Sequence, residues 1–538
     1  MAVPDPASST TPEFDVVIAG YGPTGATLAK LLARDGVSTL VVDREADIFD
    51  KPRAIGMDHE ALRTLQFCEI AHELSPYLRA YQGSEWHGVN GQLIRRFAPA
   101  APPYPLVWPP NVSFLQPKFE RMLRHSVERE AHARTLLESE VLGFEDLADA
   151  VAVTLRGRRD DRRRTVRAKY LIGCDGANSV VRSQLGVTME DLECDEWWVV
   201  IDALRNGEAD FGDCNVQYCR PDRPGTYVVG PGMLRRWEFR ILPHESPDEF
   251  RQPERVQALL GEKVDTRQLT IWRSAVYRFQ ARVANDWGRG RVFLAGDAAH
   301  QTPPHLGQGL VSGLRDAANL AWKLRFVLAG GSAWLLDTYR QERRPHFRAL
   351  AKTARDFGEI IGVLDPREAE RRDERLERAL ASRTAPETRQ DLIPPLSDGL
   401  LDRDEAGRPT PSAGELFMQI QVRPRDGSPP RLFDDGALPR FQLLTLGSEP
   451  MRWLDAEHAR CWAAVGGERW AIESPGREHL PGNEQVLVEH DGRFREWMQA
   501  RRASAVLVRP DRYVYGIAAA AGALERMVVN VVRDVLGG

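Results

Sequence analysis

The feature that most constrains this chain is a short glycine-rich turn near its N-terminus. The β-rich apolar run FDVVIAG leads into GYGPTG, which the apolar helical segment ATLAKLLARDG follows. A second strand-like run, VSTLVVD, ends at Asp43. Strand, turn, helix and strand in this order predict a βαβ unit with a parallel sheet behind it.

The glycines of the turn match the spacing G-x-G-x-x-G at Gly20, Gly22 and Gly25. The first allows a tight turn, the second lets the backbone approach a pyrophosphate, and the third lets the helix pack against the strand. A carboxylate at Asp43 is placed to accept hydrogen bonds from an adenosine ribose. The unit predicts a dinucleotide site, and Asp43 followed by Arg44 leaves NAD and FAD both open.

Length and charge narrow the class of protein. The 538 residues suggest two to four domains, and 72 basic against 77 acidic residues argue against nucleic acid as the main partner. No apolar run is long enough to span a bilayer, and the N-terminus carries no signal-peptide pattern. Six scattered cysteines without a C-x-x-C pair predict a reducing compartment, so we expect a cytoplasmic protein without a membrane partner.

Three further stretches carry functional side chains. KPRAIGMDHEALRTL places Arg53 just beyond the βαβ unit, and CDGANSVVR places Asp175 after a buried strand. AGDAAHQTPPHLGQG contains Asp297 and leads, through glycines, into a helix whose first backbone amides can face an electron-rich group.

In this order the stretches resemble the class A flavoprotein aromatic hydroxylases. PRAIGMDHEALRTLQ, GLRDAANLAWKL and RPDRYV are most similar to the 3-(3-hydroxyphenyl)propionate / 3-hydroxycinnamate hydroxylase branch. The resemblance implies FAD as cofactor, NADH or NADPH as a transient co-substrate, and hydroxylation of a small phenolic substrate with O2 in aromatic catabolism. Two alternatives stay open: a flavin-dependent tailoring hydroxylase of a polyketide or other larger phenol, and a non-catalytic FAD-binding protein. A homodimer is one option for the oligomeric state.

The resemblance also assigns site residues. It implies FAD contacts at Gly20, Gly22, Gly25, Asp43, Arg44, Arg53, Gln116, Asp175, Asp297, Gly307, Gly309 and Leu310. Pro303 and His305 are expected beside the reaction, whereas His300 is expected to be a packed residue. Val311 stands where many relatives have Asn, so backbone amides would have to hold the flavin ring edge.

Substrate contacts are expected from the strand-like runs before Asp297. The candidates are Tyr218, Arg220, Tyr227 and Arg240, with an arginine pairing with a propionate carboxylate. Glu238 is an alternative partner for Arg240, because residues two apart share a strand face. Asp297, His300 and His305 do not predict a metal site, since Pro303 and Pro304 break any helix that would align them.

The predicted fold class is α/β. A flexible arm at 1–12 precedes a Rossmann-like FAD-binding domain at 13–190 and 275–365, into which an antiparallel β-sheet substrate domain is inserted at 191–274. A charged helix or linker at 366–394 then leads to a C-terminal thioredoxin-like domain at 395–538. Its lone Cys461 argues against a redox role, so we expect this domain to serve at an interface or in stabilisation.

Overall fold

The computed structural model describes residues 12–423, 428–475 and 485–537, so the arm predicted at 1–12 lies outside the described residues except for Pro12. The first sheet confirms the predicted βαβ unit: β1 pairs in parallel with β11 and β2, and parallel pairing continues to β18 and β8. In order, its strands are β17 (Gly288–Arg289), β18 (Val292–Leu294), β11 (Arg163–Gly173), β1 (Phe14–Ala19), β2 (Thr39–Val42) and β8 (Ala133–Leu136), with β10 (Val151–Gly157) on β11 and β9 (Ser139–Asp146) on β10.

Helices cover this sheet because their apolar faces need burial. The helix after the glycine turn, α1 (Pro23–Arg34), packs beside α4 (Gln116–Glu128) and α7 (Gly309–Leu328). Leu28, Leu32 and Leu320 are fully buried in the core that these helices share with β1. The short α5 (Val180–Gln184) follows β11. Because β1, β11 and β18 run parallel, the glycine turn after β1 and the Asp297 loop after β18 lie at the carboxyl end of the same sheet.

A second, eight-stranded sheet carries the strands that were expected for a substrate domain. In order these are β19 (His300–Gln301), β16 (Leu269–Ala284), β12 (Met189–Arg205), β15 (Leu234–Arg240), β14 (Gly225–Val229), β13 (Asn215–Tyr218), β5 (Ser84–His87) and β6 (Leu93–Phe97). The sheet therefore extends beyond residues 191–274. Strands β5 and β6 come from the first third of the chain, and their pairing with β13 is non-local.

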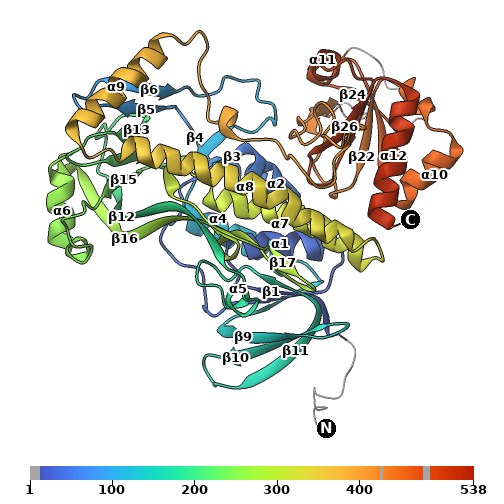
Figure 1. Cartoon of the computed structure of the whole chain (residues 1–538), viewed down its shortest axis with the longest axis horizontal. Helices are drawn as coiled ribbons and strands as arrows, with labels where there is room; N and C mark the ends of the chain where they lie inside the picture. The colour runs from blue at the N-terminus through green and yellow to red at the C-terminus, as the bar shows by residue number, and fades with distance from the viewer. Residues whose placement is uncertain (1–11, 424–427, 476–484, 538) are drawn as a thin grey trace.

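The two faces of this second sheet are packed differently. One face buries Val199, Ile201 and Trp237 against α6 (Pro253–Gly261). On the other face, Trp198 packs with Phe357 of α8 (Trp334–Ile361), the long helix that crosses the molecule in Figure 1. Alternating strand residues thus supply one face with a core and the other with a site.

Smaller elements join the two sheets. A three-stranded sheet consists of β3 (Gly56–Asp58), β7 (Asn111–Ser113) and β4 (Arg79–Ala80), with α2 (His59–Phe67) and α3 (Ala71–Leu74) beside it. The charged segment after α8 is a helix in its first part, α9 (Pro366–Ala381), whose Asp365 cap accepts a hydrogen bond from the Glu368 amide.

The C-terminal unit is a mixed α/β layer with its own sheet. Its strands are, in order, β21 (Arg431–Leu432), β20 (Gln421–Arg423), β24 (Val486–Glu489), β23 (Glu468–Glu473), β22 (Gln442–Leu446), β25 (Ala505–Val508) and β26 (Val514–Ala518), with helices α10 (Ala456–Ala464), α11 (Arg493–Ala500) and α12 (Ala521–Leu536). The last helix, α12, buries Met527, Val528 and Val531.

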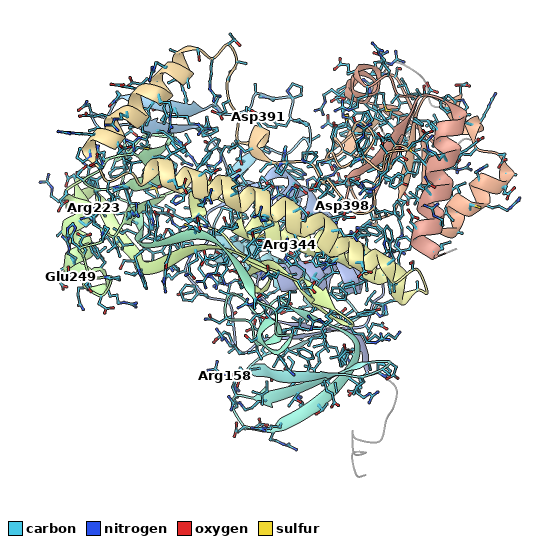
Figure 2. All side chains as sticks on the ribbon, in the orientation of Figure 1. Arg158, Arg223, Glu249, Arg344, Asp391 and Asp398 are labelled. Carbon is cyan, nitrogen blue, oxygen red and sulfur yellow. The ribbon has the colours of Figure 1, made fainter. Side chains whose placement is uncertain are left out.

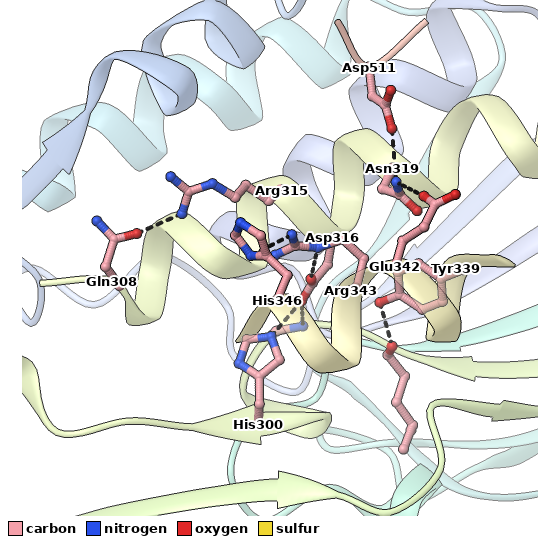
Figure 3. A network of polar contacts seen from close by, with 12 residues as sticks. His300, Gln308, Arg315, Asp316, Asn319, Tyr339, Glu342, Arg343, His346 and Asp511 are labelled. Atoms are coloured by element: carbon pink, nitrogen blue, oxygen red, sulfur yellow. Dashed lines mark hydrogen bonds and ion pairs between the residues drawn. The ribbon is translucent and has the colours of Figure 1, made fainter. Parts of the chain in front are cut away.

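Buried charges and aromatic rings join this unit to the rest of the chain. Trp322 of α7 packs on Phe441, with ring centroids 5.5 Å apart. The Arg509 guanidinium donates to both Glu342 carboxylate oxygens at 2.9 and 2.6 Å, and Lys323 Nζ donates to the same carboxylate at 2.7 Å. Figure 3 shows Glu342 with Asn319 and Asp511, the latter contributed by the C-terminal unit. The unit is therefore part of the structural core of the molecule.

The arginine-rich hairpin between β10 and β11 is exposed to solvent at its tip. Arg158 projects at the tip between β10 and β11 (Figure 2), and Arg159 there pairs with Glu138 at 2.6 Å. All six cysteines are free, and no helix within the described residues is long and apolar enough to cross a membrane.

Candidate active site

One cavity of ≈ 810 Å³ joins the carboxyl end of the first sheet to the open face of the second. Among the residues implied as FAD contacts, those that line it are Gly20, Gly22, Asp43, Arg44, Arg53, Gln116, Asp175, Asp297, Gly307, Gly309 and Leu310. His305 lines the same cavity, whereas Gly25 and Pro303 are not among the lining residues. Segments that are far apart in the sequence thus share one enclosed space, as ligand sites usually do.

The three glycines of the turn have three different surroundings. A Cβ on Gly20 would lie 2.3 Å from the Cys174 carbonyl oxygen, and one on Gly25 would lie 2.0 Å from the Gly20 carbonyl oxygen. A Cβ on Gly22 would meet no atom within 4 Å. Gly20 and Gly25 are therefore required for packing, and Gly22 presents bare backbone to the cavity at the start of α1.

Hydrogen bonds fix the groups beside this turn. The Asp43 carboxylate accepts from the amides of Tyr21 at 2.6 Å and Glu45 at 2.8 Å. The Gln116 side-chain oxygen accepts from the amides of Arg53 at 3.0 Å and Ala54 at 2.6 Å. Gln116 therefore orients the Arg53 loop, and the Arg53 guanidinium is half-exposed, with Glu120 as its nearest carboxylate at 3.8 Å.

Sequence reasoning missed two residues on the same helix. Glu120 and Arg124 line the cavity together with Gln116. Their spacing of four residues along α4 was the available signal, because i and i+4 positions share a helix face. Arg124 lies over the Tyr21 ring, with its guanidinium carbon 4.5 Å from the ring centroid.

The two aspartates of the later motifs have different environments. Asp175 caps α5, accepting from the Ser179 hydroxyl at 2.5 Å and the Val180 amide at 2.8 Å. Asp297 is open to the cavity, and no described residue forms a hydrogen bond with its carboxylate. Burial within the surrounding protein raises the pKa of Asp297, while His300 and Arg53 act in the opposite direction. An unpartnered carboxyl here is available to the hydroxyls of a bound ligand.

His300 is a packed residue, as expected. Its Nε2 lies 2.6 Å from an Asp316 carboxylate oxygen, and its ring stacks on Phe347 with centroids 3.8 Å apart. Asp316 also accepts from the Gly296 amide at 3.0 Å and from Arg343 at 2.9 Å (Figure 3). This cluster holds the strand end that presents Asp297 to the cavity.

A second cluster holds the loop between Asp297 and α7. The Arg315 guanidinium donates to the Gln308 side-chain oxygen at 2.6 Å and to Asp58 and Glu60, both at 2.5 Å. The Tyr513 hydroxyl, from the C-terminal unit, donates to Glu60 at 2.7 Å. The C-terminal unit therefore braces the loop of Gly307 and Gly309 through three buried side chains.

His305 lies at the inner end of the cavity. Its ring contacts Trp198 edge-on, with centroids 5.3 Å apart, and its Nε2 has no hydrogen-bond partner among the described residues. Burial, with a further contribution from Arg240, lowers the pKa of His305 to about 4. At neutral pH it is an uncharged imidazole that can accept or donate one hydrogen bond.

The buried His305 makes stability depend on pH. Because its pKa falls from 6.5 to about 4 on folding, the unfolded chain binds more protons between these values. The stabilising contribution is present above pH 6.5 and is lost as the pH falls toward 4. We expect the urea midpoint of His305→Asn to fall less steeply over this range than that of the native chain. His132→Asn, at an exposed site, is the control and should keep the native slope.

The four residues expected to bind substrate do not line the cavity. Tyr227 is on the opposite face of its strand, packed on Trp237 with centroids 5.1 Å apart. Arg240 donates to Glu196 at 3.0 Å, so Glu238 is not its partner. Tyr218 and Arg220 do not line the cavity either. Their role in substrate binding stays a prediction, because none of the four lines this cavity.

The cavity face of the second sheet presents other side chains. Those that line the cavity from its strands are Val200, Asn215, Gln217, Thr226, Val228, Val229, Arg236, Glu238, Tyr277, Phe279 and Gln301, and Arg389 joins them from the segment after α9. Parity along each strand was the signal that could have found them, but the sequence does not show which face is open. Within the described residues, no group of three or more His, Cys, Asp or Glu side chains is placed to hold a metal ion.

The residues that line the first half of the cavity fit FAD. Gly22 leaves room for a pyrophosphate against the backbone, and Asp43 and Asp297 offer carboxylates to ribose and ribityl hydroxyls. Gly307, with φ of 67°, adopts a left-handed conformation that turns the loop into α7. Val311 is fully buried and its apolar side chain offers no hydrogen bond to a ligand.

Comparisons with known proteins agree with this geometry. A family model described as "FAD binding domain" matches residues 13–354, and one described as "HcaD C-terminal domain" matches residues 414–533. The chain is 34% identical over 523 residues to a 3-(3-hydroxy-phenyl)propionate/3-hydroxycinnamic acid hydroxylase of Mycobacterium sp. (strain KMS), covering 95% of this chain and 89% of the relative.

Solved structures share the fold over nearly the whole chain. The flavin-dependent monooxygenase PieE, crystallised with FAD and substrate, superimposes with a TM-score of 0.78 at 24% identity, covering 97% of this chain and all of the other. The anhydrotetracycline hydroxylase OxyS from Streptomyces rimosus superimposes with a TM-score of 0.74 at 27% identity, covering 98% of this chain and 99% of the other.

Proposed function

Since the chain belongs to the FAD binding domain family and is a flavin-dependent aromatic monooxygenase, we propose that it hydroxylates 3-(3-hydroxyphenyl)propionate or 3-hydroxycinnamate to the 2,3-dihydroxy product, in aromatic catabolism. FAD is the cofactor, NADH or NADPH the co-substrate, and O2 the oxidant of this proposal. Six free thiols favour the reducing environment of the cytoplasm.

One observation carries the proposal. A single cavity is lined on one side by the glycine turn, Asp43 and Asp297, and on the other by the open face of the second sheet. A cofactor ring and an aromatic substrate can therefore share one protein-enclosed space. Enclosure matters because water in such a site diverts reducing equivalents to H2O2.

The chain supplies binding, orientation and desolvation for this reaction. Bound FAD supplies the redox chemistry by which a reduced nicotinamide and O2 deliver one oxygen atom to the ring. Gly22 and Asp43 would hold the adenosine half of FAD, and the loop from Gly307 to Leu310 would hold its ring. His305 and Phe279 line the cavity, and the Trp198 ring packs behind His305, so this part of the lining is largely aromatic.

A cation is available for the substrate carboxylate. Arg389 lines the cavity, and its guanidinium donates to the Leu306 carbonyl at 2.6 Å and lies over the Tyr81 ring. It has no ion-pair partner among the described residues, whereas Arg79 pairs with Asp213 at 2.7 Å. A phenylpropionate would give Arg389 a carboxylate partner, which favours this substrate over an uncharged phenol.

The test is NADH oxidation by the FAD-loaded protein with and without 3-(3-hydroxyphenyl)propionate, with product and H2O2 both quantified. We expect strong stimulation and a dihydroxylated product. Arg389→Gln should raise KM for this substrate by about tenfold or more, the value of one charge-assisted hydrogen bond, and leave KM for 3-propylphenol nearly unchanged. A yellow protein without stimulation by either compound would contradict the proposed substrate.

A larger phenol is the second candidate. The similarity to OxyS, a hydroxylase of anhydrotetracycline, favours it. If anhydrotetracycline stimulates NADH oxidation with product formation, and 3-(3-hydroxyphenyl)propionate does not, the chain is a tailoring hydroxylase.

A further inference from the structure

A row of side chains crosses the cavity face of the second sheet. The strand register places Gln217 opposite Thr226, Thr226 opposite Glu238, and Glu238 opposite Val200. Directly opposed residues point to the same face of a sheet, and all four line the cavity. The row therefore forms a short polar strip that ends in Val200, on the surface where a substrate ring would lie.

Two members of the row satisfy each other. The Thr226 hydroxyl donates to the Gln217 side-chain oxygen at 2.7 Å. The proton of Thr226 is thus in use, and no described residue forms a hydrogen bond with the Glu238 carboxyl. Within this strip, the Glu238 carboxyl is therefore a hydrogen-bond acceptor to which no described residue donates.

Glu238 is also buried, with 6% of its surface exposed. Its nearest cation is Arg236, whose Nη1 lies 3.8 Å from a Glu238 oxygen, beyond hydrogen-bond distance. Arg236 is already bound to Asp202, at 2.7 and 3.1 Å, and to the Arg53 carbonyl at 2.8 Å. Arg236 therefore contributes charge near Glu238 without occupying its lone pairs.

The surroundings suit a proton acceptor. Burial raises the pKa of Glu238 above its ordinary value, and Asp202 adds to this while Arg236 opposes it. A carboxyl with a raised pKa is a stronger base than a solvated one. The other titratable side chains that strand parity or register places on this face are Glu196 on β12, Arg240 on β15, and Arg273 and Tyr277 on β16.

We propose that Glu238 is a catalytic residue that accepts the hydrogen bond of the substrate phenol and takes its proton as the ring is attacked. The inference rests on the proposed function. The phenolic O–H bond breaks, its electron pair stays on the phenol oxygen, and a new O–H bond forms on the Glu238 carboxylate. The phenol oxygen then releases electron density into the ring as a ring carbon bonds the oxygen that bound FAD and O2 supply. That carbon loses its hydrogen to solvent as a proton, and the proton on Glu238 returns to the phenol oxygen as the aromatic system is restored.

The deciding experiment compares the FAD-loaded native chain with Glu238→Gln, which keeps the size and removes the base. With 3-(3-hydroxyphenyl)propionate, we expect product formation to fall by about 10²–10⁴-fold, the usual contribution of a general base. Substrate Kd, measured from the flavin absorbance change, should stay within about tenfold, and H2O2 should replace product. Glu208→Gln, at an exposed site, is the control and should behave as the native chain.

A rescue separates proton transfer from a structural role. Ring-fluorinated analogues whose phenol is already ionised at the assay pH need no base. For each substrate the ratio of native to variant rates is compared, and this ratio should fall toward one for the ionised analogues. Raising the pH should rescue the variant with the parent substrate in the same way.

Each outcome decides the point. Native-like product formation by Glu238→Gln, or a rate ratio that is the same for ionised and neutral phenols, would overturn the role of Glu238. If Glu238→Gln does not fold, Glu238→Asp keeps the carboxylate and should retain partial activity with the same rescue. If the native chain hydroxylates no single-ring phenol, the proposed function fails, and the same ratio measured with anhydrotetracycline tests Glu238 by itself.

Discussion

Gly22→Val is expected to yield a folded protein that does not retain FAD. Gly22 has φ of −74°, which any residue adopts, and an added Cβ would meet no protein atom within 4 Å. The new side chain would instead enter the cavity where the backbone must approach a pyrophosphate. Overpacking of this kind costs about 1–3 kcal/mol, so FAD affinity should fall about 10- to 100-fold.

The measurement is the flavin bound per chain after desalting, together with a Kd from fluorescence quenching and a circular-dichroism spectrum. Gly25→Ala is the matched comparison, because its Cβ would lie 2.0 Å from the Gly20 carbonyl oxygen. That variant should lose thermal stability even without FAD, whereas Gly22→Val should unfold as the native apoprotein does. Native FAD affinity in Gly22→Val would show that the pyrophosphate does not pass this turn.

Glu342→Gln is expected to destabilise the whole molecule by about 3–5 kcal/mol, because it leaves the buried Lys323 without a carboxylate and Arg509 with Asp511 alone. Burial opposes the ionisation of Glu342, but Arg509 and Lys323 outweigh it and lower the pKa of this carboxyl to about 2. The variant has nearly the same shape, so the effect isolates charge. Because Arg509 lies in the C-terminal unit, that unit should loosen together with α7 and α8.

Urea unfolding followed by tryptophan fluorescence checks this prediction, with Glu370→Gln on the exposed face of α9 as the control. The pH dependence gives a second readout. The folded pKa of Glu342 lies below its ordinary value of 4.5, so its contribution is present above pH 4.5 and is lost as the pH falls toward 2. The native chain should therefore lose stability in acid more steeply than the variant. Equal slopes would mean that Glu342 is not the anion that holds this cluster.

Local sequence carried much of the cofactor side of the site. The glycine turn, Asp43 and the Asp297 loop each lie within a short segment whose strand and helix could be recognised from periodicity. The sequence did not show which residues of these segments line the cavity. Gly25 and Pro303 belong to the right segments but face the packed core, because the side on which a residue points depends on what packs against its element.

The substrate side was beyond sequence reasoning for a physical reason. Tyr227 and Thr226 are neighbours in one strand and point to opposite faces, and only the packing of α6 decides which face is closed. Arg240 was expected to bind a carboxylate, but it pairs with Glu196 of the adjacent strand. Arg389 comes from a segment that was expected to be a linker and reaches the cavity only because the chain folds back over His305 and Leu306.

The sequence by itself determined the nucleotide-binding half of this protein, because a G-x-G-x-x-G turn between a strand and a helix fixes its backbone through local sterics and nearby hydrogen bonds. It also determined the reaction family through the order of three motifs. Only the tertiary structure decided which carboxyl of the second sheet faces the cavity, that Arg389 has no ion-pair partner among the described residues, and how the C-terminal unit braces the loop before α7. Glu238, Arg389 and Tyr513 owe these positions to contacts between segments far apart in the chain, and no local pattern records such contacts.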